Sequence, residues 1–380
     1  MRFRLVNGTL HTAVSPEALR ADLLVEDGRI AAIGGGAAAG DPVVDCSGLH
    51  IYPGLVEAHS HTGLHGFAAG YEGRDYNETN EPVSCDLRAI DAFNPLDPVL
   101  ERARRAGVTC VAAGPGSSNV LGGTFVAVKT VGSCVDDMVV KAEVAMKCAF
   151  GENPKKRYRT KSISSRMTTA AKLRGALAKA RDYLRKINEA ETSGGKRPDF
   201  DLGCEALLPV LRGEIPLKAH AHQANDIMTA IRIAKEFGVK VTIEHCTEGH
   251  LVAAELARAK VPVAVGPTMI FGGKPELGNR SFETPAILDR AGCPVSIITD
   301  APVIPPEFLA LSAAFAVKAG MDPFHALQAI TINPARHLGI SDRVGSLEVG
   351  KDADIVVTDG DILNPLSDVK AVYIDGNAVL

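Results

Sequence analysis

The feature that most constrains the fold is a series of eight short apolar segments between Ile51 and Thr299, which alternate with stretches of helical character. Strand-like segments that alternate with helices predict βα units and a parallel sheet. Eight is the number of strands in a (β/α)₈ barrel. We therefore expect an α/β chain built on a (β/α)₈ TIM barrel. The eight strands are expected at a segment ending at His59 and at 108–113, 125–131, 144–148, 217–220, 239–245, 261–265 and 294–299.

The helical stretches carry recognisable start and stop signals. A helix is expected over 97–106, and a longer one over 168–191, where apolar residues recur at helical spacing. Asn225 or Asp226 can cap the start of a helix that runs to Phe237, and Gly238 can end it. Pro305 and Asp322 are expected to open later helices.

Both ends of the chain predict short strands and tight turns. Asn7-Gly8 and Asp27-Gly28 near the start, and Asp359-Gly360 and Asp375-Gly376 near the end, are hairpin signals between apolar runs. Each end alone is too small to bury a core. We expect the two ends to form one small β-sandwich from residues 1–50 and 341–380, with the barrel, residues 51–340, inserted between them.

Metal-binding side chains stand where the expected strands end. His59 and His61 are two residues apart, so in a strand they point to the same face. His220, His245 and Asp300 each follow an apolar run of their own. Strand ends of such a barrel meet at one face, where active sites lie. The sequence therefore predicts that these side chains converge.

Composition restricts the class of partner. The 380 residues carry a net charge of only −4, which gives no reason to expect nucleic acid. The eight cysteines form no Cys-x-x-Cys pair, which suits a reducing cytoplasm rather than a disulfide scaffold. The first residues lack a signal-peptide core, and no run is long and apolar enough to span a membrane. We expect a cytoplasmic homo-oligomer that acts on a small molecule.

Five motifs in a fixed order carry a family resemblance. IYPGLVEAHSH at 51–61, KAHAH at 218–222, VTIEH at 241–245, SIITD at 296–300 and GSLEVGKDADIVVTDG at 345–360 occur in that order. Together they resemble the metal-dependent amidohydrolase superfamily, and within it the imidazolonepropionase-related branch. The resemblance covers nearly the whole chain, and it agrees with the barrel and the terminal sandwich.

The resemblance implies a metal centre. It assigns His59, His61, His220, His245 and Asp300 as ligands, and makes Asp300 the proton shuttle as well. Neutral imidazoles suit Zn²⁺, and other divalent metals under other geometries. One or two ions are expected.

Two strand-end residues, Lys147 and His222, leave alternatives open. Lys147 is the candidate for a lysine carboxylated by CO₂ that bridges two metals, but it can also bind substrate as a cation, with Glu152 as the strand-four ligand. His222 is expected to contact the substrate or a carboxylate, or else to be a solvated loop residue. Glu244 is expected to face the outer helices, because it alternates with His245, and Cys246 to pack in the core.

Two further residues are candidates for substrate binding. Arg166 lies in a basic loop, GENPKKRYRTKSISSRM at 151–167, that is not general to the superfamily, and Arg binds carboxylates in a planar fork. His65, with Tyr71, lies in the Gly-rich loop after the first strand, which is long enough to be functional.

The expected activity is metal-dependent hydrolysis of a C–N bond in an amide or cyclic amide, with Asp300 carrying the proton. A metallodipeptidase is the first alternative. A deaminase is less favoured, because such relatives carry a Glu shortly after the strand-five His and this chain has none there. A binding protein without chemistry is the last alternative.

Overall fold

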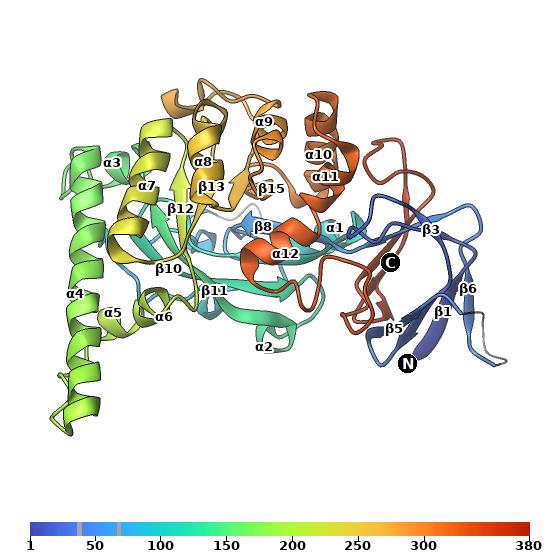
Figure 1. Cartoon of the computed structure of the whole chain (residues 1–380), viewed down its shortest axis with the longest axis horizontal. Coiled ribbons are helices and arrows are strands. Elements are labelled where there is room, and N and C mark those ends of the chain that lie inside the picture. The colour runs from blue at the N-terminus through green and yellow to red at the C-terminus, as the bar shows by residue number, and fades with distance from the viewer. Residues whose placement is uncertain (36–39, 67–69) are drawn as a thin grey trace.

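The computed structural model describes residues 1–35, 40–66 and 70–380. An eight-stranded barrel surrounded by helices lies beside a smaller pair of sheets that holds both chain ends (Figure 1). The expected fold class, a TIM barrel with a small sandwich from both termini, is confirmed.

The barrel strands follow one another around the sheet in sequence order. They are β8 (Leu55–Ser60), β9 (Val108–Ala113), β10 (Leu121–Lys129), β11 (Val139–Ala149), β12 (Leu217–Ala221), β13 (Val241–His245), β14 (Val263–Val265) and β15 (Val295–Ile297). Backbone hydrogen bonds nearly close the ring between its first and last strands. His61 N–H, just after β8, donates to Ala301 O over 2.7 Å, and both strands bond to residues 329–330: Val56 N–H of β8 donates to Ile330 O over 2.9 Å, and Ile297 N–H of β15 donates to Ala329 O over 2.8 Å.

One strand runs against the others. Strand β10 pairs antiparallel with both β9 and β11, whereas the remaining pairs are parallel. A parallel neighbour requires a crossover of about a dozen residues or more, whereas an antiparallel one needs only a short turn. Residues 114–120 and 130–138 form these short connections, and the second contains only the single turn α2 (Val135–Met138). The expectation of a fully parallel barrel was therefore wrong at this strand.

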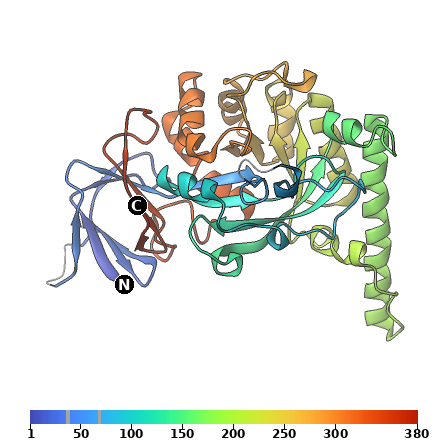
Figure 2. The same cartoon turned by 180° about the vertical axis from the view of Figure 1, so that it is seen from behind.

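Helices pack around the outside of the barrel (Figures 1 and 2). The longer ones are α1 (Pro98–Arg105), α4 (Arg166–Ser193), α7 (Ala224–Phe237), α8 (Ala253–Ala259), α9 (Thr284–Arg290), α10 (Leu309–Lys318) and α12 (Ile332–Leu338). Shorter ones are α3 (Glu152–Arg157), α5 (Leu202–Glu205), α6 (Leu208–Leu211), α11 (Pro323–Gln328), η1 (Tyr71–Gly73), η2 (Ala89–Asp91), η3 (Gly249–Val252), η4 (Pro275–Leu277) and η5 (Pro306–Phe308).

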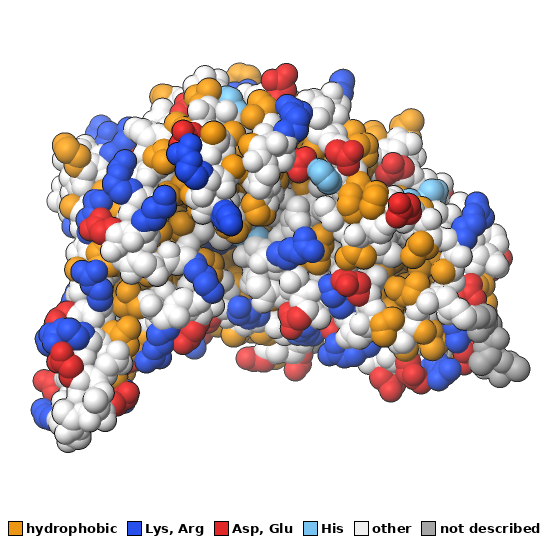
Figure 3. Space-filling model, viewed as in Figure 1, with side chains coloured by type: hydrophobic (Ala, Val, Ile, Leu, Met, Phe, Trp, Pro, Cys, Tyr) orange, Lys and Arg blue, Asp and Glu red, His pale blue; other side chains and the backbone are white. Residues whose placement is uncertain are grey.

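Most helix ends follow the expected chemistry. Ser165 caps α4 by accepting a hydrogen bond from Thr168 N–H, and Gly238 ends α7 in a left-handed conformation. The expected cap at Asn225 or Asp226 is wrong, because α7 already begins at Ala224 and has Gln223 as its cap. The free end of α4 extends past the body of the molecule and carries both signs of charge (Figure 3).

Both chain ends contribute to the two terminal sheets. The four-stranded sheet contains β1 (Arg2–Val6), β4 (Leu23–Glu26), β5 (Arg29–Ile33) and β6 (Val43–Asp45). The six-stranded sheet contains β2 (Thr9–Leu10), β3 (Leu19–Arg20), β7 (His50–Pro53), β16 (Ile355–Thr358), β17 (Val369–Ile374) and β18 (Asn377–Ala378). Residues from both ends share one apolar core, in which the Phe3 and Tyr373 rings stack 5.2 Å apart.

A buried charge cluster joins this unit to the barrel. Lys129, the last residue of β10, places Nζ 2.7 Å from Asp354, 3.0 Å from Asp352 and 3.2 Å from Asp375. Burial alone would lower the pKa of Lys129, but the three carboxylates outweigh it and raise that pKa. The lysine therefore stays charged and ties the barrel to both C-terminal strands.

Candidate metal centre

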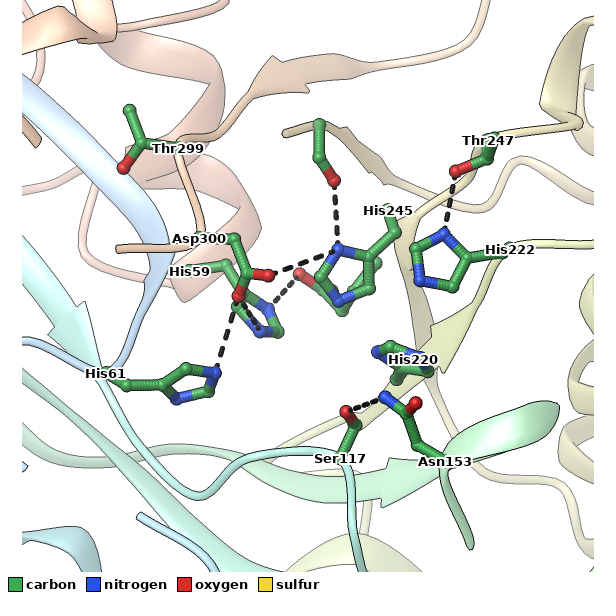
Figure 4. Close-up of polar contacts among 12 residues, drawn as sticks. His59, His61, Ser117, Asn153, His220, His222, His245, Thr247, Thr299 and Asp300 are labelled. Carbon is green, nitrogen blue, oxygen red and sulfur yellow. Dashed lines mark hydrogen bonds and ion pairs between the residues drawn. The ribbon is translucent and has the colours of Figure 1, made fainter. Parts of the chain in front are cut away.

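Strand β8 directs three ionisable side chains into the barrel. Glu57, His59 and His61 alternate along it, and all three are buried. His59 and His61 converge with His245 and Asp300 at the ends of other strands (Figure 4).

Two residues of the centre have an unusual backbone. His245 has a φ of +70° and Asp300 a φ of +54°, in the left-handed region that non-glycine residues seldom adopt. Such conformations cluster at functional sites, where the surrounding structure holds them. At His245 the left-handed backbone also interrupts the alternation of side chains along β13. The consecutive side chains of Glu244 and His245 therefore both face the barrel interior.

Asp300 lies between three imidazoles. Its Oδ1 is 3.6 Å from His59 Nε2 and 3.4 Å from His61 Nε2, and its Oδ2 is 4.0 Å from His245 Nδ1. Oδ1 is buried and has no hydrogen-bond partner among the described residues. His59, His245 and Asp300 present ligand atoms that all lie within 4.8 Å of one another, which is a fitting arrangement for a cation.

A second group adjoins the first and shares His245 with it. His220, His222 and His245 also bring ligand atoms within 4.8 Å of one another. Both ring nitrogens of His220 are buried and lack a hydrogen-bond partner within the described parts of the chain. A buried imidazole without a partner is costly unless a cation or a ligand satisfies it.

The outer nitrogens of three imidazoles are already engaged. Nδ1 of His59 lies 2.9 Å from a Glu244 oxygen, Nδ1 of His61 is 2.7 Å from Gly114 O, and Nδ1 of His245 is 2.9 Å from Gly266 O. These oxygens only accept, so each Nδ1 carries the proton and each Nε2 keeps a lone pair. This is the tautomer that a metal-binding histidine needs.

The protonation states of these side chains also favour the binding of a metal cation. Burial lowers the pKa of His59, His220 and His222 well below the usual value, and that of His245 to about 4, so these rings are neutral at pH 7. Burial works against the charged form of Asp300, but the surrounding imidazoles outweigh it and its pKa is lowered. Neutral imidazoles around one carboxylate are a suitable ligand set for Zn²⁺.

Lys147 reaches the centre from β11. Its side chain is fully buried, and Nζ lies 3.1 Å from His59 Nε2. Burial lowers the pKa of Lys147 to about 8, which increases the fraction of free amine. The alternative ligand, Glu152, is in neither group of converging ligand atoms among the described residues. It lies in α3 and accepts a hydrogen bond from Glu276 N–H over 3.1 Å.

Glu244 faces the barrel interior, so its predicted outward orientation is wrong. It is fully buried and lies 2.9 Å from His59 Nδ1, 2.8 Å from Lys218 Nζ and 2.9 Å from His337 Nε2. The prediction assumed regular alternation up to His245, and the left-handed backbone there breaks that alternation. Lys218 was missed, although its position two residues before His220 on one strand was a usable signal.

Glu57 joins the first and last strands behind the imidazoles. One of its oxygens accepts the His59 N–H over 3.0 Å, and the other accepts the N–H and the hydroxyl of Thr299 over 2.8 and 2.6 Å. Burial raises the pKa of Glu57 to about 7. These bonds hold the neighbour of Asp300 against β8, and thereby fix where Asp300 enters the site.

A group of polar side chains that the sequence did not predict lies beside His222. His222 Nδ1 is 2.7 Å from Thr247 Oγ1, and His222 Nε2 is 3.2 Å from Lys274 Nζ and 3.6 Å from a Glu276 oxygen. Lys274 and Glu276 lie in the loop after β14, where neither strand periodicity nor a motif marks them.

The structure places one of the two predicted substrate-binding residues near the histidines and the other in a separate hollow. His65 lies near His61 and lines the same hollow of about 290 Å³, with its ring 5.1 Å from that of Tyr76. The structure does not bring Arg166 to the histidines: its guanidinium pairs with Asp226 over 2.9 Å, and it lines a separate hollow between α4 and α7. Tyr71 is 81% exposed.

Within the described residues, none of the helices has the length and apolar character needed to cross a bilayer.

Comparison with known proteins places this geometry in a family. The model of the amidohydrolase family matches residues 50–379. The chain belongs to the amidohydrolase family. With this family it belongs to the hydrolases that act on C–N bonds, and it resembles relatives named imidazolonepropionase.

Three relatives illustrate the family. A solved structure of an amidohydrolase from Thermotoga maritima is 41% identical, covers 100% of this chain and 99% of its own, and has a TM-score of 0.96. Amidohydrolase tasK of Hapsidospora irregularis is 29% identical over 94% of this chain, which spans 39% of tasK. An imidazolonepropionase of Thermoplasma acidophilum is 25% identical over 88% of this chain and 82% of its own length.

Proposed function

We propose that this amidohydrolase cleaves the C–N bond of an amide, a cyclic amide or an N-acyl substrate. One or two divalent cations, with Zn²⁺ the first candidate, would be bound by His59, His61, Lys147, His220, His245 and Asp300. The observation that carries the proposal is the set of buried imidazoles whose Nδ1 atoms are held by acceptors, which leaves their Nε2 atoms as potential metal ligands beside Asp300 and its unpartnered oxygen.

Lys147 is proposed to be carboxylated when two cations are bound. The free amine adds CO₂ to give a carbamate and a proton, which replaces a buried cation with an oxygen ligand. Burial supports this step, because it lowers the pKa of the amine to about 8.

Asp300 is proposed to move the proton. A divalent cation in this site lowers the pKa of a coordinated water toward ~7 and polarises the substrate carbonyl. Asp300, ionised and central among the imidazoles, accepts the proton of the attacking water and delivers it to the leaving nitrogen. His222, held through Nδ1 by Thr247, is assigned contact with the developing oxyanion.

A deaminase is the second candidate, because a carboxylate that the sequence did not predict approaches the site. Glu276 lies 3.6 Å from His222 Nε2 and 3.9 Å from His220 Nε2. Burial alone would raise its pKa, but His222 and Lys274 outweigh burial and lower it. The Glu276 carboxylate is paired with Lys274 Nζ over 2.5 Å, so it is engaged as an ion-pair partner, which favours the amide hydrolase.

Metal analysis combined with a substrate screen tests the proposal. We expect about one or two equivalents of divalent metal in the purified protein, and amine release from N-acyl compounds, dipeptides or cyclic amides. The Asp300→Asn variant should keep most of its metal but lose about 10²- to 10⁴-fold in kcat. Ammonia release from purines alone would favour the deaminase. A protein without bound metal and without turnover would leave only a binding role.

A further inference from the structure

Two loops at the mouth of the barrel are fastened to each other beside the candidate metal centre. The loop after β11 begins α3 with Gly151, Glu152 and Asn153, and the loop after β14 carries Lys274 and Glu276. The Glu152 N–H donates to one oxygen of Glu276 over 3.0 Å, and the Glu276 N–H donates to one oxygen of Glu152 over 3.1 Å. We call this reciprocal pair the 152/276 clamp.

The clamp requires a glycine. Gly151 has a φ of +80°, and a Cβ at this position would lie 2.6 Å from a Glu276 oxygen. The residue before the clamp therefore has both a left-handed backbone and no room for a side chain. Gly151 and Glu152 are consecutive in the sequence, within the GENP stretch at 151–154.

The 152/276 clamp positions the ammonium group of Lys274 beside His222 of the candidate metal centre. Lys274 Nζ is 2.5 Å from a Glu276 oxygen, 3.2 Å from His222 Nε2 and 3.4 Å from Asn153 Oδ1. Glu276 is fully buried, whereas the Lys274 side chain remains 25% exposed, so its ammonium is accessible to a ligand. An ammonium has three donors, and only the bond to Glu276 is short, so a substrate oxygen can replace a longer contact.

An apolar hollow of about 450 Å³ begins at Lys274. Its apolar lining comprises Met269, Ile270, Phe271, Leu277, Val303 and Ile304. Val303 N–H donates to the carbonyl of Asp300 over 2.9 Å, so the far wall starts at the turn that carries Asp300. The hollow therefore lies between Lys274 and the turn that carries Asp300.

We propose that Lys274 binds a carboxylate of the substrate and that the hollow receives the apolar group next to it. The substrate class is then an N-acyl amino acid, or a dipeptide, with an apolar residue at the free carboxyl end. This inference rests on the proposed hydrolase function and assigns to Lys274 the role that the sequence suggested for Arg166. A cyclic amide without a carboxylate would leave Lys274 without a substrate partner.

The test compares N-acetyl-L-leucine with its carboxamide in amine-release assays. Wild type should prefer the carboxylate, and Lys274→Met should reduce this preference, the ratio of kcat/KM for the carboxylate to kcat/KM for the carboxamide, by about 10- to 100-fold, mainly through KM. Lys156→Met, which removes an exposed lysine of α3, is the matched control and should behave as wild type. Metal content, measured in each variant, shows that the centre remains assembled.

The outcomes separate this inference from the function on which it rests. Equal turnover of both compounds, unaffected by Lys274→Met, would overturn the carboxylate site and leave the hydrolase intact. If neither compound is hydrolysed, calorimetric titration of N-acetyl-L-leucine into the metal-loaded protein decides. Binding that is lost in Lys274→Met but retained in Lys156→Met supports the site, and absent or equal binding refutes it.

Discussion

At the scale of single residues, the candidate centre depends on what lies behind each imidazole. A metal-binding histidine is oriented by the acceptor at its other ring nitrogen. For His59 this acceptor is Glu244, which is itself fixed by Lys218, Thr242 and His337 in the barrel interior. Glu244 thus acts on the metal through His59 without touching the substrate.

Replacement of Glu244 should therefore weaken metal binding. In Glu244→Gln the amide either accepts from His59 less strongly or presents its NH₂ group to it, so we expect metal affinity to fall by about 10- to 100-fold. Competition with a chelator of known affinity measures this change directly. Glu236→Gln removes an exposed partner of Arg174 and serves as the control. Unchanged affinity in Glu244→Gln would show that His59 is oriented by other contacts.

The buried histidines also predict how acid affects the metal-free protein. Burial lowers the pKa of His59, His220, His222 and His245, from 6.5 to about 4 for His245. Below pH 6.5 the unfolded chain binds protons that the folded chain cannot, so stability should fall as pH falls from 6.5 toward 4. Each such histidine contributes up to about 1.4 kcal/mol per pH unit.

Urea unfolding in EDTA at pH 5, 6 and 7 measures this dependence. The midpoint should rise with pH, and a His220→Asn, His222→Asn double variant should show a shallower rise. A midpoint that is higher at pH 5 than at pH 7 would contradict the assignment of neutral buried rings.

At the scale of elements, the loops that follow the strands give this barrel its own site. The loops after β11 and β14 are held together by the 152/276 clamp, and the left-handed backbone at position 151, with Glu276 close by, favours glycine there. The antiparallel strand β10 is joined to β9 and β11 by short turns instead of helical crossovers. Ser117, in the turn before β10, accepts a hydrogen bond from Asn153 Nδ2 over 2.6 Å, so this turn also contacts the loop after β11.

A pair of glycine substitutions tests the clamp. Gly151→Ala combines a left-handed φ with a close contact to Glu276, so we expect a loss of about 1–3 kcal/mol in the free energy of unfolding. Gly175→Ala, inside α4 with open space around its Cβ, should instead stabilise by about 0.5–1 kcal/mol. Thermal unfolding of both variants gives the comparison. Equal shifts would mean that the loops adapt around position 151.

At the scale of the whole molecule, the barrel and the terminal sheets form one packed body. The sandwich core combines residues from both chain ends, and the Lys129 cluster joins the last residue of β10 to the segment that carries β16 and β17. The three carboxylates stabilise the buried ammonium of Lys129, but removal of one partner leaves an uncompensated buried charge, which lowers the free energy of unfolding.

Removal of Lys129 should destabilise the chain as a unit. Lys129→Met leaves Asp354 buried without its cation, whereas Asp352 keeps its pairs with Arg343 and Arg29, and we expect a loss of about 3–5 kcal/mol and a clearly lower Tm. Lys179→Met, which breaks an exposed pair with Asp201, should cost no more than about 1 kcal/mol. Differential scanning calorimetry distinguishes the two. Two separate transitions in the Lys129 variant would indicate that the cluster alone couples barrel and sandwich.

The sequence by itself determined the architecture and the strand ends. Eight apolar runs, the turn signals at both termini and the period-two spacing of His59 and His61 are local patterns, and strand geometry converts them directly into positions. Parallel strand ends then collect at one face, which is why residues as distant as His59 and Asp300 could be expected to meet. The β10 reversal was missed because strand direction depends on connection length rather than on composition.

Only the tertiary structure decided which side chains surround those strand ends. Glu244 faces inward because a left-handed residue follows it, and Lys274 and Glu276 reach His222 from a loop without periodicity. Arg166 lies away from the histidines because it pairs with Asp226, a residue sixty positions further along the sequence. Such contacts are decided by close packing and by the pairing of buried charges, both of which depend on residues that the chain brings together only after it has folded.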